Sequence, residues 1–331
     1  MSRSGLSYLL WPASLAYASY MFVRRRLLSG KGYKSTCKVI SVGNLSMGGS
    51  GKTPVSIALA LALKERGMKV LYSSRGYKSA IEEGATLISD GTLERISPKA
   101  GDEAIEAARA LLGIPVICGR DRQRTLHFAE NLEIDTVILD DAFQHLKVQR
   151  DIDILVFDSE TGLGNGFIIP AGYLRENLSA IDKDCIIIFH HKPMNEPNLK
   201  LKLKLQERTD AFFEVHSTND SIIHKGEEID PVSLQDKRIT LLCGIADPRS
   251  FKRGAQALGI SWQNEMLFAD HQDFSSDEIR DQIRARDADY LLCTAKDAVK
   301  LLPEFEDKLL ILQLRTYLPE SLLNFILYKL S

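Results

Sequence analysis

Short apolar runs alternate with longer segments of helical character along most of the chain after residue 38. The runs are rich in Val, Ile and Leu, which is typical of strands buried on both faces of a sheet. They lie at residues 38–42, 68–73, 114–118, 136–139, 152–157 and 185–190. Helical patterns follow at residues 53–63 and 102–112 and after residue 122. This alternation predicts an α/β domain with a mostly parallel sheet flanked by helices.

Two segments interrupt this alternation. Residues 85–89 and 93–97 flank Asp90-Gly91, a pair that favours a hairpin turn. Residues 158–180 carry four glycines and a proline with few helix signals, so they predict a long functional loop.

A second, smaller α/β unit is predicted toward the C-terminus. Residues 193–198 resemble a linker, and residues 199–205 alternate Leu and Lys, which fits either a half-buried strand or a solvated helix. The second unit starts near Arg238, with strands expected at 239–243, 290–293 and 309–314. Its helices are expected to start near Pro248, Ser276, Lys296 and Pro319.

Composition narrows the class of protein. A chain of 331 residues is long enough for two domains, and a net charge of −2 implies no general affinity for nucleic acid. The five cysteines are scattered and odd in number, without the spacing of a zinc site. We therefore expect reduced thiols in a cytosolic setting.

The most informative segment is a loop between the first predicted strand and the helix after it. Its glycines would let backbone N–H groups face a phosphate, and the helix N-terminus would add positive potential. Lys52 could reach the β- and γ-phosphates, and Thr53 could hold Mg²⁺. The pattern usually begins with Gly, where this chain has Ser46. The predicted phosphate-binding loop comprises Ser46, Met47, Gly48, Gly49, Ser50, Gly51, Lys52 and Thr53.

Polar residues after other strands are candidates for the rest of the site. Asp140 and Asp141 follow four apolar residues, where a second acid often completes a magnesium site; an exposed turn is the alternative. Arginines near strand ends could clamp phosphates or lie on the surface. These are Arg75, Arg120 and Arg122.

Four further polar residues are ambiguous in the sequence alone. Gln144 and His145 could face the cleft or be ordinary polar groups after the strand. Asp102 has the position of a helix N-cap, and a lone histidine in a polar loop, such as His271, is usually just exposed.

The N-terminal segment is apolar and then basic. Residues 6–23 carry no charge, and Arg24-Arg25-Arg26 follows directly. A transmembrane anchor, a signal peptide, a buried core helix and an interfacial helix are all compatible with this pattern. A phosphate loop needs cytosolic ATP, which argues against export. We favour membrane contact by a helix that lies on or dips into the cytosolic face, with its arginines near anionic lipid.

Taken together, the motifs resemble those of the tetraacyldisaccharide 4′-kinases, the lipid A precursor kinases of Gram-negative bacteria. The resemblance runs along most of the chain in nine ordered motifs. They include Val42-Gly43-Asn44 with Gly48-Gly49-Ser50-Gly51-Lys52-Thr53-Pro54, Ser74-Arg75-Gly76-Tyr77, Gly101-Asp102-Glu103, Gly119-Arg120-Asp121-Arg122, Leu139-Asp140-Asp141-Ala142-Phe143-Gln144-His145, Pro170-Ala171-Gly172-Tyr173-Leu174-Arg175-Glu176, Gly244-Ile245-Ala246-Asp247-Pro248, Asp270-His271 and Thr294-Ala295-Lys296-Asp297.

The resemblance implies a fold and a reaction. It implies an N-terminal membrane-contacting segment at 1–30, a P-loop kinase domain at 31–220 and a smaller domain at 221–331, with the site between the domains. The reaction would transfer the γ-phosphoryl of ATP, with Mg²⁺, to the 4′-hydroxyl of tetraacyldisaccharide 1-phosphate, giving lipid IVA. The enzyme would work at the cytoplasmic face of the inner membrane, and no obligate protein partner is implied.

The resemblance also implies roles for individual residues. Asp102 matches the proposed general base, paired with His271, and Lys52 completes the catalytic set. Thr53, Asp140 and Asp141 match the magnesium-associated groups. The substrate candidates are Arg75, Arg120, Gln144, His145, Arg175 and Glu176. The chain departs from the family at Tyr173, where Pro is usual, and at Ala295, where Glu is usual.

Two other classes of protein remain as alternatives. A P-loop switch or metallochaperone-type GTPase at the membrane is disfavoured, because the chain has neither an Asn-Lys-x-Asp guanine signal nor a metal-ligand cluster. A non-catalytic adaptor is disfavoured by the intact Lys52, Thr53, Asp140 and Asp141.

Overall fold

The computed structural model describes residues 5–76, 84–92, 96–97, 100–245, 248–269, 272, 274, 276–302 and 304–331. The chain forms two compact units. Unit 1 contains residues 1–191, 195–216 and 317–331, and unit 2 contains residues 192–194 and 217–316. The C-terminal residues from Tyr317 thus belong to unit 1, whereas the sequence placed them in the smaller domain.

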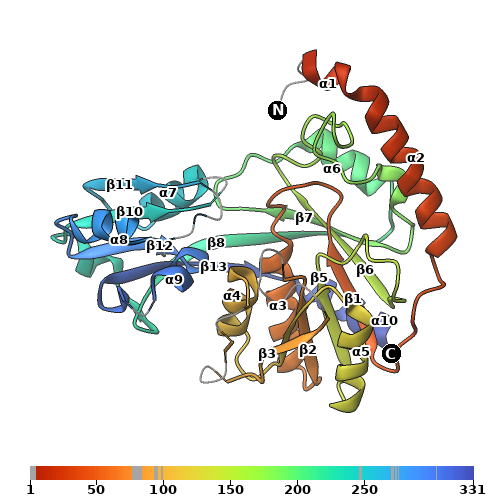
Figure 1. The fold of residues 1–331 in the computed structure, drawn as a ribbon, viewed down its shortest axis with the longest axis horizontal. Coiled ribbons are helices and arrows are strands. Elements are labelled where there is room, and N and C mark those ends of the chain that lie inside the picture. The colour runs from red at the N-terminus through yellow and green to blue at the C-terminus, as the bar shows by residue number, and fades with distance from the viewer. Residues whose placement is uncertain are drawn as a thin grey trace. The chain divides into compact units, whose positions relative to one another are not determined.

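A mostly parallel sheet forms the centre of unit 1 (Figure 1). The strand order is β8-β7-β6-β1-β5-β2-β4-β3, and only the edge pair β3–β4 is antiparallel. The strands are β1 (Lys38–Gly43), β2 (Val70–Ser74), β3 (Thr86–Ser89), β4 (Val116–Cys118), β5 (Thr136–Asp140), β6 (Ile152–Asp158), β7 (Ile186–His191) and β8 (Phe212–His224), the last of which continues into unit 2. The six strands predicted from apolar runs in this part of the chain are confirmed. The second strand of the predicted hairpin includes residues 93–95, which lie outside the described residues.

Helices cover both faces of this sheet, which explains its nearly continuous apolar strands. Ile40 and Ile138 pack with α3, α4 and α10 in one core, whereas Val39 and Val137 pack with α5 in another. The helices of unit 1 are α1 (Gly5–Leu9), α2 (Trp11–Leu28), α3 (Lys52–Glu65), α4 (Asp102–Ala110), α5 (Arg122–Asn131), α6 (Leu199–Gln206), α10 (Glu320–Leu330) and the 3₁₀ turn η2 (Leu178–Ala180).

One of these helices settles a question that the sequence left open, and another lies in a different unit from the one that the sequence predicted. The Leu–Lys alternation forms α6, in which Leu201 and Leu205 are buried while Leu199 and Leu203 are exposed. The C-terminal helix α10 belongs to unit 1 because it buries Leu322, Leu323 and Ile326 in the core that α3 also lines.

The part of the sheet that lies in unit 2 has the strand order β11-β10-β12-β13-β8, with β9 paired to β8. Two cores lie on opposite faces of it: Leu241 belongs to one and its neighbour Leu242 to the other. Its elements are β9 (Glu227–Ile229), η3 (Pro231–Leu234), β10 (Ile239–Cys243), α7 (Pro248–Ala257), β11 (Asn264–Leu267), α8 (Asp277–Arg284), β12 (Tyr290–Thr294), α9 (Ala295–Leu301), η4 (Glu306–Lys308) and β13 (Leu309–Tyr317). The three predicted strands and the helix starts near Pro248, Ser276 and Lys296 are confirmed, whereas the helix predicted near Pro319 forms α10 of unit 1.

Candidate functional site

The predicted phosphate-binding loop connects β1 to α3, as expected. Gly51 is the N-cap of α3 and has a φ of +87°, a conformation that glycine adopts without strain. The buried Asn44 donates from Nδ2 to the Ser50 hydroxyl over 3.0 Å and so braces the loop from inside. Lys52 and Thr53 begin the helix, so both stand at its positive end.

A histidine that the sequence did not single out supports this loop. His190, fully buried near the end of β7, lies with Nδ1 3.1 Å from the Ser50 carbonyl oxygen. A Cβ at Gly51 would come within 2.1 Å of the same ring nitrogen, so this position excludes any side chain. The only signal in the sequence was that His190 lies at a strand end on the ligand-binding edge of a parallel sheet.

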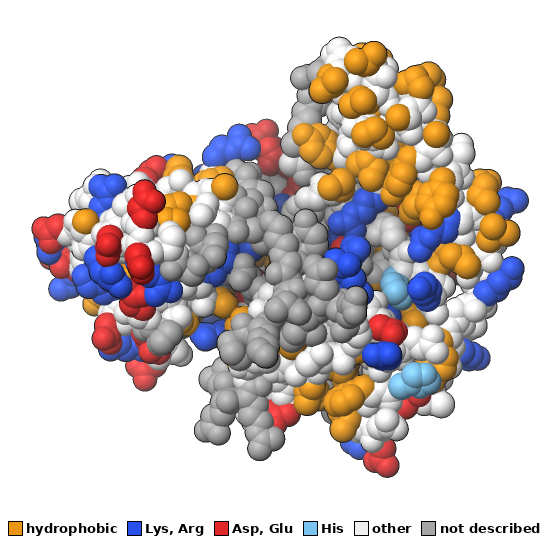
Figure 2. All heavy atoms as spheres, in the orientation of Figure 1, with side chains coloured by type: hydrophobic (Ala, Val, Ile, Leu, Met, Phe, Trp, Pro, Cys, Tyr) orange, Lys and Arg blue, Asp and Glu red, His pale blue; other side chains and the backbone are white. Residues whose placement is uncertain are grey.

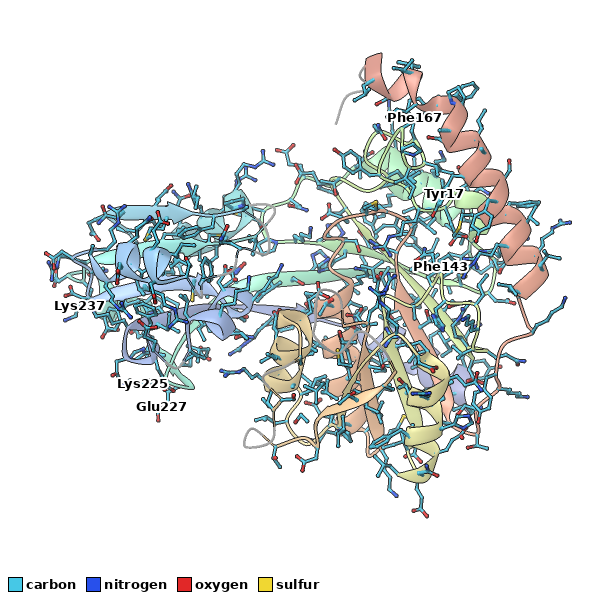
Figure 3. The ribbon with its side chains drawn as sticks, in the orientation of Figure 1. Tyr17, Phe143, Phe167, Lys225, Glu227 and Lys237 are labelled. Carbon is cyan, nitrogen blue, oxygen red and sulfur yellow. The ribbon has the colours of Figure 1, made fainter. Side chains whose placement is uncertain are left out.

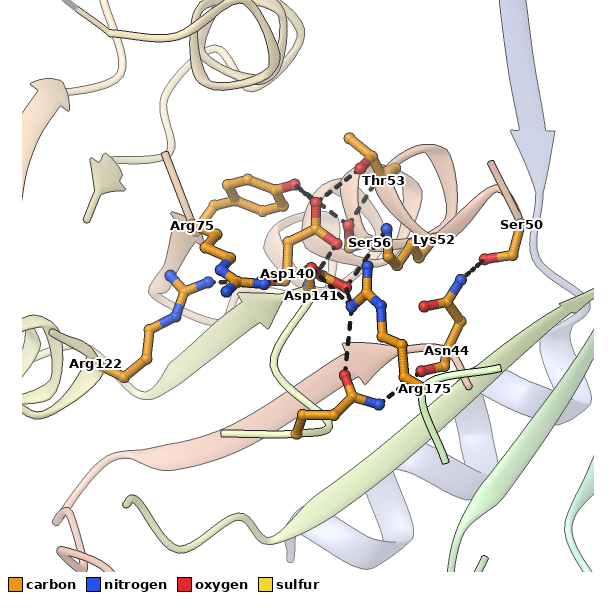
Figure 4. Close-up of polar contacts among 12 residues, drawn as sticks. Asn44, Ser50, Lys52, Thr53, Ser56, Arg75, Arg122, Asp140, Asp141 and Arg175 are labelled. Carbon is orange, nitrogen blue, oxygen red and sulfur yellow. Dashed lines mark hydrogen bonds and ion pairs between the residues drawn. The ribbon is translucent and has the colours of Figure 1, made fainter. Parts of the chain in front are cut away.

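Asp140 is fixed beside the start of α3 (Figure 4). The β1–β5 pairing places Val42 opposite Asp140, which brings Asp140 to the helix that follows β1. Its Oδ2 accepts hydrogen bonds from Thr53 Oγ1 at 2.8 Å and from the Tyr72 hydroxyl at 2.9 Å. Burial and the neighbouring Asp140 raise the pKa of Tyr72 well above its usual range, so Tyr72 remains a donor.

Asp141 collects three cationic side chains. Its carboxylate lies 3.5 Å from Lys52 Nζ, 3.4 Å from Arg75 Nη1 and 2.9 Å from Arg175 Nη1. Burial alone would raise the pKa of Asp141, but the charges of these cations outweigh burial and lower it to about 2. The acid pair and two of the predicted substrate arginines are thus brought together with Lys52 and Thr53.

Arg122 has a structural role rather than an exposed phosphate-clamping one. Its side chain is buried, and it donates to Ser73 Oγ, to the Ser74 carbonyl and to the Asp140 carbonyl over 2.6, 2.9 and 2.6 Å. It therefore ties the ends of β2 and β5 together beneath the acid pair. Arg120, in contrast, is exposed in the turn that leads to α5.

Gln144 and His145 occupy different environments. Gln144 donates from Nε2 to the Asn44 carbonyl at 3.0 Å and accepts from Arg175 at 3.4 Å, so it joins Arg175 to the segment that precedes the phosphate loop. His145 is partly buried, and burial together with Arg122 and Lys147 lowers its pKa to about 4.

The long loop predicted at residues 158–180 runs beside the phosphate loop. Its backbone pairs with the loop entry: Met47 N–H donates to the Tyr173 carbonyl, and Arg175 N–H donates to the Leu45 carbonyl, each over 2.6 Å. Tyr173, one of the two departures from the family pattern, is 45% exposed. The other, Ala295, is the first residue of α9.

Glu176 does not lie among the cations around Asp141. Both of its carboxylate oxygens accept from Arg25 of α2, at 2.8 and 2.9 Å, and its side chain is only 4% exposed. In the structure this predicted substrate residue therefore binds Arg25 of the N-terminal helix. Arg25 in turn faces Glu176 rather than the surroundings of the molecule.

The N-terminal helices dock through a narrow inner stripe. Ser7, Ser14 and Met21, spaced seven residues apart, are the buried members. Ser14 Oγ donates to the Ile168 carbonyl at 2.8 Å and accepts from Ala171 N–H at 3.0 Å. Figure 3 shows Phe167, Tyr17 and Phe143 along this junction; Phe167 packs edge-on against Tyr8.

The outer side of these helices is apolar, and Figure 2 shows these side chains gathered over α1 and α2. Because these apolar side chains are exposed, the N-terminal segment is not the buried core helix that the sequence allowed as one alternative. Among the helices that the structure describes, none is long and apolar enough to cross a membrane. The exposed apolar residues are Leu6, Tyr8, Leu9, Trp11, Leu15, Tyr20, Phe22, Val23, Leu27 and Leu28.

The proposed catalytic pair is described only in part. Asp102 is the first residue of α4, whose N-cap is Gly101 rather than Asp102 as the sequence suggested. The side chain of Asp102 and the whole of His271 lie outside the described residues.

Comparisons with known proteins agree with these motifs. A sequence model of the tetraacyldisaccharide-1-P 4′-kinase family matches residues 6–331. The tetraacyldisaccharide 4′-kinase of Desulfotalea psychrophila is 35% identical over 304 residues, covering 88% of this chain and 87% of the relative. That of Syntrophus aciditrophicus is 33% identical over 322 residues, covering 91% and 86%.

A solved structure extends the agreement to three dimensions. The crystal structure of LpxK from Aquifex aeolicus in complex with ATP has a TM-score of 0.79 and 28% sequence identity, covering 98% of this chain and 99% of that one. The match extends over nearly the whole length of both chains. This chain belongs to the tetraacyldisaccharide-1-P 4′-kinase family.

Proposed function

We propose that the protein transfers the γ-phosphoryl group of ATP to the 4′-hydroxyl of a tetraacyldisaccharide 1-phosphate, yielding lipid IVA for lipid A synthesis. The observation that carries this proposal is the hydrogen bond from Thr53 to Asp140 beside the Lys52–Asp141 contact. It places a hydroxyl, two carboxylates and an ammonium at the N-terminus of one helix, the arrangement that phosphoryl transfer requires.

The residues beside the loop fit a magnesium ion. Mg²⁺ prefers oxygen ligands and is commonly held by one or two carboxylates together with a hydroxyl and nucleotide phosphates. Thr53, Asp140 and Asp141 supply such oxygens, and Asp141 stays ionised because its pKa is about 2. When bound, the ion would neutralise charge on the phosphates.

The cations around Asp141 have a related task. Lys52 would bind the β- and γ-phosphates, and Arg75 and Arg175 would stabilise the charge that spreads over the transferred group. Arg75 suits this role because its side chain is half-exposed while it already contacts the acid. Gln144 would orient Arg175 through their hydrogen bond.

The acceptor hydroxyl needs a base. We assign this role to Asp102, with His271 as its partner, because the family motif places them so and because a sugar hydroxyl is a poor nucleophile. Arg120 and His145 remain candidates for contact with the disaccharide or its phosphate.

The N-terminal helices would bring the site to the membrane. Their outer apolar face carries Trp11 and Tyr20, side chains typical of the headgroup region, and Arg26 lies exposed at the basic end. We propose a peripheral or shallowly inserted position on the cytoplasmic face of the inner membrane, where a substrate with four acyl chains resides.

The decisive experiment is transfer of labelled γ-phosphate from ATP and Mg²⁺ to tetraacyldisaccharide 1-phosphate in detergent micelles. Labelled lipid would establish both acceptor and reaction, and Lys52→Ala should abolish it. ATP hydrolysis without labelled lipid, lost in Lys52→Ala, would overturn the acceptor assignment and favour the nucleotide-driven switch instead.

A further inference from the structure

We propose that Arg25 of α2 is a positioning residue for phosphoryl transfer, which acts through Glu176 to hold Arg175 against Asp141. This inference rests on the proposed kinase function and assigns a second task to the N-terminal helix. The helix would then complete the active site as well as approach the membrane.

The Arg25–Glu176 contact has the geometry of a strong ion pair. Nε and Nη2 of Arg25 each donate to a different oxygen of Glu176, at 2.8 and 2.9 Å, so the guanidinium binds the carboxylate as a fork. The two side chains are 14% and 4% exposed, which removes most of the solvent screening that weakens surface pairs. A pair of this kind fixes the direction of both groups.

Glu176 follows Arg175 directly, and the two side chains have different partners. Arg175 places Nη1 2.9 Å from Asp141 Oδ1, while Glu176 faces α2. The backbone N–H of Arg175 donates to the carbonyl of Leu45, the residue just before the phosphate loop, which fixes the chain at this point. Because Glu176 is bonded directly to Arg175, a shift of Glu176 would rotate Arg175 about this point relative to Asp141.

The same helix also contacts the segment that follows the acid pair. The Arg25 guanidinium lies 4.3 Å from the centre of the Phe143 ring, and Arg24 Nη1 donates to the Gln144 carbonyl at 3.1 Å. Both the segment that carries Arg175 and the segment after Asp141 are thus attached to one turn of α2. This turn can set the separation of Arg175 and Asp141 without touching a substrate.

The three consecutive arginines accordingly divide into two classes. Arg24 and Arg25 contact other segments of unit 1. Arg26, in contrast, is exposed and lies over the ring of Phe22 in the same helix, 5.1 Å from its centre. The sequence suggested that all three serve anionic lipid. Of the three, Arg26 is therefore the arginine that we assign to contact with anionic lipid.

The alternative is that the pair only fastens α2 to the protein. Breaking a buried ion pair from one side leaves an uncompensated charge and destabilises the fold, whereas replacing both partners with apolar residues of similar size is often neutral. The double variant Arg25→Met/Glu176→Met therefore removes the positioning contact while preserving a folded helix junction. Arg25→Lys keeps the charge but cannot form the two-pronged contact.

The test measures kcat, the KM for ATP and the KM for the lipid acceptor in detergent micelles for Arg25→Lys, Glu176→Gln and the double variant. Melting temperature and co-sedimentation with vesicles of anionic phospholipid are measured in parallel. Arg208→Met, which removes an exposed arginine of unit 1 distant in sequence from the site, is the matched control. We expect kcat to fall roughly 10- to 100-fold in all three variants, the range seen when a supporting partner of an active-site group is lost.

We expect vesicle binding and the melting temperature of the double variant to remain near those of the unaltered protein. A folded double variant with unaltered kcat would overturn the proposal, as would losses of kcat that only parallel losses of folded protein. A fall in vesicle binding with kcat unchanged in micelles would assign Arg25 to lipid instead. Absence of labelled lipid with the unaltered protein would reject the proposed function itself, a result distinct from all of these.

Discussion

The Thr53 hydroxyl donates a 2.8 Å hydrogen bond to Asp140, although 87 residues separate them in the sequence. The contact forms because β1 and β5 are neighbours, so the helix after β1 starts beside the last residue of β5. Tyr72, at the neighbouring β2, donates to the same carboxylate oxygen. Three adjacent strands thus fix one acid at the phosphate-loop helix.

Asp140→Asn tests the importance of this acid. We expect kcat to fall at least about 100-fold, because the variant keeps the shape of the side chain but loses the charge that a magnesium ion requires. Steady-state transfer of labelled phosphate at several Mg²⁺ concentrations measures the effect. Asp184→Asn, which alters an exposed acid in the turn before β7, is the control. A variant with normal turnover at low Mg²⁺ would remove Asp140 from the metal site.

Asp102→Ala tests the general base. We expect turnover to fall by orders of magnitude while ATP affinity changes little, because a base acts on the acceptor hydroxyl in the transition state and contributes little to nucleotide binding. Turnover and equilibrium ATP binding are measured on the same preparation. Equal losses in both would contradict the assignment and point to a structural role for Asp102 at the start of α4.

The sequence predicted those features that depend on the local pattern of residues. Apolar runs located the strands, and the Gly-rich segment located the turn between β1 and α3 within about a residue. The identity of the acids at the end of β5 followed from the same logic, because parallel strands present their carboxyl ends on one edge.

Contacts between segments that are distant in the sequence could not be predicted from local patterns. Nothing local to Glu176 indicates that it pairs with Arg25, 151 residues earlier, rather than with a substrate. The seven-residue spacing of Ser7, Ser14 and Met21 was present in the sequence, but small polar residues in an apolar helix do not reveal which side is buried. The attachment of α10 to unit 1 likewise depends on packing against α3, which the order of elements along the chain does not disclose.

Leu15→Glu/Phe22→Glu tests the outer face of α2. Both side chains are about half exposed, so charging them should leave the melting temperature nearly unchanged while weakening binding to vesicles. Leu132→Glu, an exposed leucine after α5, is the matched control and should bind vesicles normally. Co-sedimentation with vesicles of anionic phospholipid provides the measurement. Unchanged binding in the double variant would show that another surface contacts the membrane.

His145 should make the protein less stable in mildly acidic solution. Burial, reinforced by Arg122 and Lys147, lowers its pKa in the folded protein to about 4, whereas an unfolded histidine titrates near 6.5. Between these values the unfolded chain binds more protons, so the free energy of unfolding falls as the pH drops from about 6.5 toward 4. Because the ring is only partly buried, we expect its contribution over this window to be on the order of 1–3 kcal/mol. Urea unfolding of the unaltered protein and of His145→Gln from pH 7.5 to 4.5 measures it: the variant should lose less stability over this range. Identical pH profiles, or a ring that titrates near 6.5 by NMR in the folded protein, would contradict the assignment of a neutral, partly buried His145.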